Sequence, residues 1–96
     1  MNIDLIKNDG AIYVTLDGRL DTTNAPKFEE LLSENYADAQ SLIINCEKLA
    51  YVSSAGLRVL LAAQKKMRDS MKLTNVCELV MEVFEMTGFA DILEIK

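Results

Sequence analysis

Two adjacent serines stand where a short apolar segment meets a predicted helix, and their hydroxyls are the functional groups that the sequence places most clearly. Residues 51–57 (YVSSAGL) run from apolar through polar and small to apolar. Ser53 or Ser54 can cap the helix by accepting a hydrogen bond from a first-turn amide, which stabilises a helix by about 0.5–2 kcal/mol. The amides and dipole of a helix N-terminus also favour a bound phosphate. A structural cap and a phosphorylation site are therefore both open at this turn.

Arg58 follows Ser54 by four residues, about one helical turn, so its guanidinium can reach a phosphate there. Phosphorylation would add a charge of about −1.5 to −2 without unfolding the domain, and a partner docked on that surface would be repelled or blocked. This role requires an exposed turn, and we expect Val52 and Leu57 on either side to anchor it in the core.

The groups that most enzymes use are missing. The sequence has no histidine to act as the usual general base, and it has no glycine-rich phosphate-binding motif or nucleophile elbow. Cys46 and Cys77 fit neither a zinc site nor a disulfide framework, so we interpret them as small buried residues in a reducing compartment. We expect no enzyme activity, metal or cofactor, although a Ser–Lys pair using Lys65 or Lys72 is left open.

The first part of the chain predicts a β-hairpin followed by a helix. Apolar residues alternate over 3–5 and 12–16 around a turn signal at 8–10, and Asp17-Gly18 is expected to end the second strand. A helix is expected from about Ala25 to Tyr36, with Pro26 in its first turn. The side chains that can cap this helix are Thr22, Thr23 and Asn24.

The second part alternates strands and helices. Residues 42–45 predict a buried strand followed by a loop, residues 55–69 a helix, and residues 71–76 a further strand, together a right-handed parallel unit. A last helix ends at Gly88, and its glutamates 78, 82 and 85 are expected to form a solvated face. The buried faces are expected to comprise Leu57, Leu60, Leu61 and Gln64 in the earlier helix and Leu79, Val80, Val83 and Phe84 in the later one.

Three segments of the chain carry recognisable motifs: residues 51–61 (YVSSAGLRVLL), residues 18–22 (GRLDT) and residues 83–89 (VFEMTGF). In this order they resemble the signature turn, the entry to the first helix and the last-helix segment of the STAS family, the bacterial anti-sigma factor antagonists. The three occur in the family's order and span nearly the whole chain. The resemblance implies an α/β fold, a mixed β-sheet with packed helices, in a single STAS-like domain over residues 1–96.

The resemblance also implies a function. Regulatory members bind an anti-sigma factor that is also an ATP-dependent serine kinase, and this binding releases a sigma factor. The kinase phosphorylates one serine of the signature turn, the antagonist then dissociates, and a separate phosphatase resets it. The matching serine is Ser54, ahead of Ser53, and Asp21 matches an acidic residue near the partner surface. The expected partner-binding residues are Asp21, Thr22, Thr23, Asn24, Ser53, Ser54, Ala55, Gly56 and Arg58.

Two positions depart from the family pattern. The family often has aspartate just before the phosphorylated serine and at the end of the buried strand, where this chain has Ser53 and Asn45. Both changes remove an acid beside the site. A STAS subunit that serves a transport or signalling assembly without phosphorylation is therefore the main alternative, and a nucleotide-binding protein or an enzyme is a third.

The charge of the chain limits its partners. The net charge is −5 and no basic stripe is present, so we expect no nucleic-acid partner and no binding to an anionic membrane. No apolar run approaches the roughly 20 residues of a membrane helix, and the N-terminus lacks the pattern of a signal peptide. The sequence predicts a cytoplasmic protein.

Overall fold

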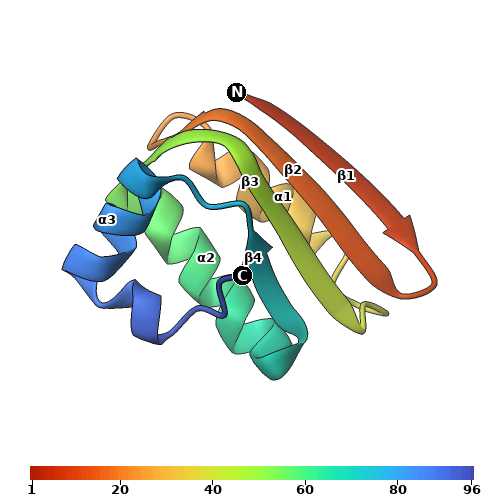
Figure 1. The fold of residues 1–96 in the computed structure, drawn as a ribbon. Coiled ribbons are helices and arrows are strands. Elements are labelled where there is room, and N and C mark those ends of the chain that lie inside the picture. The colour runs from red at the N-terminus through yellow and green to blue at the C-terminus, as the bar shows by residue number, and fades with distance from the viewer.

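The computed structural model describes residues 1–96 as a four-stranded sheet with helices against one face (Figure 1). The sheet order is β1-β2-β3-β4; β1 and β2 are antiparallel and the other neighbours are parallel. The predicted α/β fold with a mixed sheet is confirmed. In chain order the elements are β1 (Asn2–Asn8), β2 (Ala11–Leu20), α1 (Ala25–Ser33), β3 (Ser41–Val52), α2 (Ser54–Met67), β4 (Met71–Thr74) and α3 (Glu78–Thr87), with short 3-10 turns at Arg68–Ser70 and Phe89–Asp91.

The hairpin forms as the alternating pattern predicts. Asp9 and Gly10 turn the chain with φ angles of 51° and 84°. Ile12, Val14 and Leu16 point toward the helices and are fully buried, whereas Tyr13 between them is exposed on the opposite face. One face of the sheet therefore forms the core, and the other faces outward.

Strand β2 does not end at Asp17-Gly18, so that expectation is wrong. The strand continues to Leu20, and Gly18 has a φ of 115°, which residues with a side chain rarely adopt. The register between β2 and β3 shifts on both sides of Asp17-Gly18. The glycine bends the strand, and the bent end carries Leu20 toward the start of α2.

Strand β3 is much longer than the predicted strand over residues 42–45, and the expected loop after it does not exist. The strand has 12 residues. Only its first part, Leu42–Asn45, pairs with β4, and the rest continues along β2. The two register shifts are bulges that insert extra residues into β3, so inward-facing side chains no longer alternate. Strand β3 consequently leads directly into α2.

Helix α1 ends at Ser33, earlier than the predicted end at Tyr36. The side-chain amide of Asn35 donates a hydrogen bond to the carbonyl of Leu31 at 2.7 Å, and its backbone N–H donates to Leu32 at 3.0 Å. These bonds satisfy carbonyl groups of the last turn, and the helix ends there.

The buried faces of the later helices differ from the prediction. In α2, Leu57 and Leu60 are buried as expected, but Leu61 and Gln64 are only half-buried. In α3, Leu79 is 58% exposed, so its assignment to the core is wrong. Gly88 ends α3 with a φ of 81°, as predicted. The buried residues are Gly56, Leu57, Val59, Leu60, Ala63 and Met67 in α2, and Val80 and Phe84 in α3.

The C-terminal residues cover the edge of β4. That strand ends at Thr74 rather than at residue 76. Leu73 donates to the carbonyl of Glu94 and accepts from the N–H of Lys96, both at 2.9 Å, so the last residues pair with β4 (Figure 1). This pairing satisfies backbone groups that an open sheet edge would leave free.

The cysteines are both free thiols. Cys46 is buried as expected, whereas Cys77 is half-buried. Burial, with a smaller contribution from Cys77, raises the pKa of the Cys46 thiol to about 12. None of the helices combines the length and apolar content that crossing a membrane requires.

Candidate functional site

A single residue, Ser53, joins β3 to α2. Its backbone N–H donates to the carbonyl of Leu20 at 2.8 Å, which ties the joint to the end of β2. Its hydroxyl oxygen accepts from the N–H of Gly56 at 3.3 Å, and its carbonyl accepts from Leu57 at 2.9 Å. Ser53 is therefore the N-cap of α2.

Ser54 is the first residue of α2, and it is exposed. The exposed Arg58 lies one turn further along the helix and takes part in none of the ion pairs of the protein. Val52 and Leu57 are 2% and 7% exposed, which confirms that they anchor the turn. The site thus has an exposed serine at a helix N-terminus and an exposed guanidinium one helical turn further on.

The loop of residues 21–24 beside this turn is held by its own side chains. Asp21 Oδ1 accepts from the N–H groups of Thr23 and Asn24, at 3.0 and 3.3 Å. Asn24 Oδ1 accepts from the N–H of Asp21 at 2.8 Å, and its Nδ2 donates to the carbonyl of Arg19 at 2.6 Å. Helix α1 has no side-chain cap, so the expectation that residues 22–24 supply one is wrong. The carboxylate of Asp21 instead forms an Asx turn, and the side chain of Asn24 ties the loop to Asp21 and Arg19.

Gly56 lies at the contact between the first turn of α2 and the ends of β2 and β3. It is buried, and a Cβ added to it would lie 2.8 Å from Cγ of Leu20 and 2.9 Å from Cγ2 of Val52. The absent side chain lets the first turn of α2 rest on the ends of β2 and β3. Of the nine residues expected to bind a partner, Gly56 alone is buried, and the others are exposed or half-buried.

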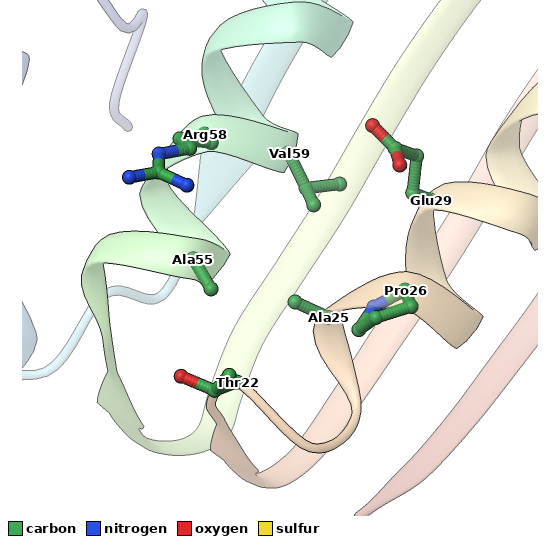
Figure 2. Close-up of a pocket in the computed structure, with 7 residues that line it drawn as sticks. All are labelled: Thr22, Ala25, Pro26, Glu29, Ala55, Arg58 and Val59. Carbon is green, nitrogen blue, oxygen red and sulfur yellow. The ribbon is translucent and has the colours of Figure 1, made fainter.

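A cleft of about 230 Å³ separates the first turns of α1 and α2 (Figure 2). Figure 2 shows Ala25 and Val59 pointing into the space between the helices, with Glu29 on the α1 side and Arg58 directed away from α1. The cleft connects the 21–24 loop to the first turn of α2, residues 53–56, which we call the Ser54 turn. The residues that line it are Thr22, Ala25, Pro26, Glu29, Ala55, Arg58 and Val59.

Sequence reasoning missed Ala25, Pro26, Glu29 and Val59 as parts of this surface. Val59 continues the face of α2 one turn beyond Ala55, which was expected to bind, and Glu29 lies one turn beyond Ala25 on α1. That signal identifies a cleft only once α1 and α2 are known to be neighbours.

Asn45 lies at the end of the β3–β4 pairing. Its Oδ1 accepts from the N–H of Glu47 and from Nδ2 of Asn75, both at 3.0 Å. The neutral amide therefore joins the two chain segments that leave this part of the sheet. Across residues 1–96, no group of histidine, cysteine, aspartate or glutamate side chains is arranged to hold a metal ion.

The sequence matches known regulatory proteins along its whole length. Residues 2–96 match the STAS domain family. A Bordetella bronchiseptica protein designated anti-sigma factor antagonist BtrV is 35% identical over 96 residues, which cover 96% of this chain and 83% of BtrV. The anti-sigma-B factor antagonist of Bacillus subtilis is 32% identical over 99 residues, which cover 100% of this chain and 91% of that protein. These relatives are regulators rather than enzymes, in agreement with the expectation from the sequence.

Solved structures of the anti-sigma factor antagonist SpoIIAA share the fold. The unphosphorylated form aligns with a TM-score of 0.85 and 19% identity, covering 99% of this chain and 88% of that chain. The phosphorylated form of SpoIIAA, a Bacillus cell fate determinant, aligns with a TM-score of 0.77 and 18% identity, covering 99% and 91%. The predicted fold, a mixed sheet with packed helices, is confirmed by this similarity.

Proposed function

The chain belongs to the STAS domain family, and we propose that it is an anti-sigma factor antagonist whose binding to the anti-sigma factor ends when Ser54 is phosphorylated. The proposal rests on one observation: the two serines occupy different structural positions. Ser53 supplies the helix cap, whereas Ser54 is exposed at the first position of α2. A kinase can therefore modify Ser54 without removing the cap.

The binding surface that we propose comprises the 21–24 loop, the Ser54 turn and the cleft between them. The cleft is smaller than the pockets of about 300–1,000 Å³ that hold small molecules, but it is suited to a side chain of a partner. Ala25 and Val59 offer that side chain apolar contacts. Glu29 on α1 and Arg58 on α2 add opposite charges, which favour one orientation of the partner.

Phosphate on Ser54 would change the charge of this surface rather than its shape. It would add about −1.5 to −2 charge beside the cleft. The first-turn amides of α2 and the guanidinium of Arg58 would stabilise it. The turn itself is held by Ser53 and Gly56, so the added charge would leave the fold unchanged. It would instead weaken the binding of the docked partner. Following the family resemblance, we propose that the anti-sigma factor is itself the serine kinase and that a separate phosphatase restores binding.

The test compares binding of wild type, Ser54→Ala and Ser54→Glu to proteins in a lysate of the source organism, with retained partners identified by mass spectrometry. Titration of the purified anti-sigma factor then measures affinity. Ser54→Ala should bind like wild type, and Ser54→Glu should bind at least about tenfold more weakly, which corresponds to about 1.4 kcal/mol. Ser53→Asp is a matched control, because it adds a charge one residue away while aspartate still caps a helix.

Equal affinity of Ser54→Ala and Ser54→Glu for the anti-sigma factor would remove the switch. Retention of only transporter or membrane-assembly subunits by all variants would favour the alternative of a STAS subunit that works without phosphorylation. Mass spectrometry of the native protein identifies the modified residue directly, and phosphate on Ser53 alone would contradict the assignment to Ser54.

A further inference from the structure

The negative charge of the chain is concentrated in its last quarter. Residues 73–95 contain five acidic residues and no lysine or arginine, while the whole chain has a net charge of −5. The rest of the chain is therefore balanced. Three of these acids, Glu78, Glu82 and Glu85, lie on α3 and are exposed. None of them forms an ion pair within the protein.

An exposed apolar stripe runs beside these glutamates. Leu79 is 58% exposed and Met86 is 87% exposed. The two are seven residues apart, so their side chains lie within about 20° of each other around the helix. The half-buried Val83 lies between them on the same side. Val80 and Phe84 hold α3 to the core from the adjacent side, and Val83 packs partly against the same core. Leu79 and Met86 remain free for another molecule.

We propose that this α3 face, formed by Leu79, Val83 and Met86 with the three glutamates beside them, docks a basic amphipathic helix of a partner protein. Apolar side chains of that helix would cover the stripe, and its lysines or arginines would pair with the glutamates. The exposed methionine suits such a contact, because its flexible side chain adapts to varied apolar surfaces.

The charge of the α3 face decides among possible occupants. A second copy of the chain would place the same glutamates opposite each other, which disfavours a symmetric dimer through this face. Nucleic acids and anionic membranes would be repelled for the same reason. A basic protein segment is attracted by the charge and buries the stripe. Docking on the α3 face would not depend on the Ser54 switch.

The probe for the test is a synthetic 18-residue peptide designed as an amphipathic helix, with leucines on one face and lysines on the other. A matched peptide has glutamates in place of the lysines. Calorimetry at low salt measures affinity for the wild-type protein, and ¹⁵N chemical shifts locate the contact. The lysine peptide should bind and change the ¹⁵N chemical shifts of residues in α3. The glutamate peptide should bind at least about tenfold more weakly.

Paired variants separate the apolar contribution from the charged one. We expect two double variants to bind the lysine peptide about tenfold or more weakly than wild type does. The first combines Leu79→Ser with Met86→Ser, and the second combines Glu82→Lys with Glu85→Lys. All four positions are exposed, so the fold should persist. Ile6→Ser is the matched control, because Ile6 is 64% exposed on β1 and its loss should leave affinity unchanged. Ser54→Glu should also bind like wild type, which distinguishes this face from the switch.

Three outcomes would overturn the proposal. The first is equal affinity of the lysine peptide for wild type and for the Leu79→Ser, Met86→Ser variant. The second is a set of shifts confined to the Ser54 turn and the 21–24 loop. The third is a molar mass, measured by light scattering, that doubles with concentration in wild type but not in that variant, because the occupant would then be a second copy.

Discussion

Replacing Gly56 with alanine tests whether the first turn of α2 depends on close packing against the strands. The added Cβ would lie 2.8 Å from Cγ of Leu20, 2.9 Å from Cγ2 of Val52 and 3.0 Å from Cδ2 of Leu20. Favourable contacts between carbon atoms are about 3.5–4.0 Å. Leu20 and Val52 are 0% and 2% exposed, so neither can move into solvent. The helix must shift outward or the core must rearrange.

Two opposing effects set the size of the change. Forcing a methyl group into a packed core costs about 1–3 kcal/mol. Alanine in place of glycine favours the helix by about 1 kcal/mol. The added methyl group would come too close to three atoms of buried neighbours, so the steric cost should exceed the gain in helix propensity. With a steric cost in the upper part of that range, about 2–3 kcal/mol, we expect Gly56→Ala to lower the free energy of unfolding by about 1–2 kcal/mol. An outward shift of the turn should also weaken partner binding, although Ser54 itself is unchanged.

Urea unfolding measures this loss, and thermal unfolding should show a decrease in Tm of about 4–8 °C for each kcal/mol. Ser54→Ala is the control, because Ser54 lies in the same turn but is exposed; its stability should remain within about 0.5 kcal/mol of wild type. A Gly56→Ala variant that gains the full helix-propensity benefit would refute the reasoning, because the neighbouring side chains would then have yielded at no cost.

The N-cap and the buried thiol give two further predictions. Ser53→Ala should lower the free energy of unfolding by about 1 kcal/mol in urea titrations, whereas Ser53→Asp should retain most of it, because both serine and aspartate cap helices well. Equal stability of the two variants would contradict the capping role. Cys46 keeps its proton up to about pH 12 in the folded state but only to about pH 9 when unfolded, so stability should fall as the pH rises above about 9. Cys46→Ala should flatten that decline, and in native protein a thiol reagent should modify the half-buried Cys77 before Cys46.

Local rules predicted the parts of the fold that depend on neighbouring residues alone. The hairpin follows from alternation and a turn signal, and Gly88 ends α3 because glycine readily adopts a positive φ. The Ser53-Ser54 turn could also be located from the sequence, since capping residues between apolar anchors form a short-range pattern. The switch assigned to it came from the family resemblance, because a capping serine and a phosphorylated serine look alike in sequence.

The missed features depend on contacts between distant segments. Bulges in β3 remove the alternation that would have revealed a long strand, and they lie where β3 pairs with the part of β2 around Asp17 and Gly18. Leu79 was assigned to the core because α3 has apolar residues on more than one side, and only the packed structure shows that Val80 and Phe84 face the sheet. The cleft requires α1 and α2 to be neighbours, which follows from the parallel pairing of β2 with β3.

The direct joint between β3 and α2 explains why added charge at Ser54 would act on a partner rather than on the fold. A serine on a long flexible loop can turn a phosphate into solvent, and a docked partner then loses little affinity. Here Ser53 is tied to Leu20 by its N–H and to Gly56 by its hydroxyl, and Gly56 leaves no space for the turn to move inward. A phosphate on Ser54 would stay beside the cleft, where the first-turn amides of α2 hold it. The electrostatic cost would therefore fall on the bound partner, and in the proposed switch this rigid joint would let one modification change affinity without unfolding the protein.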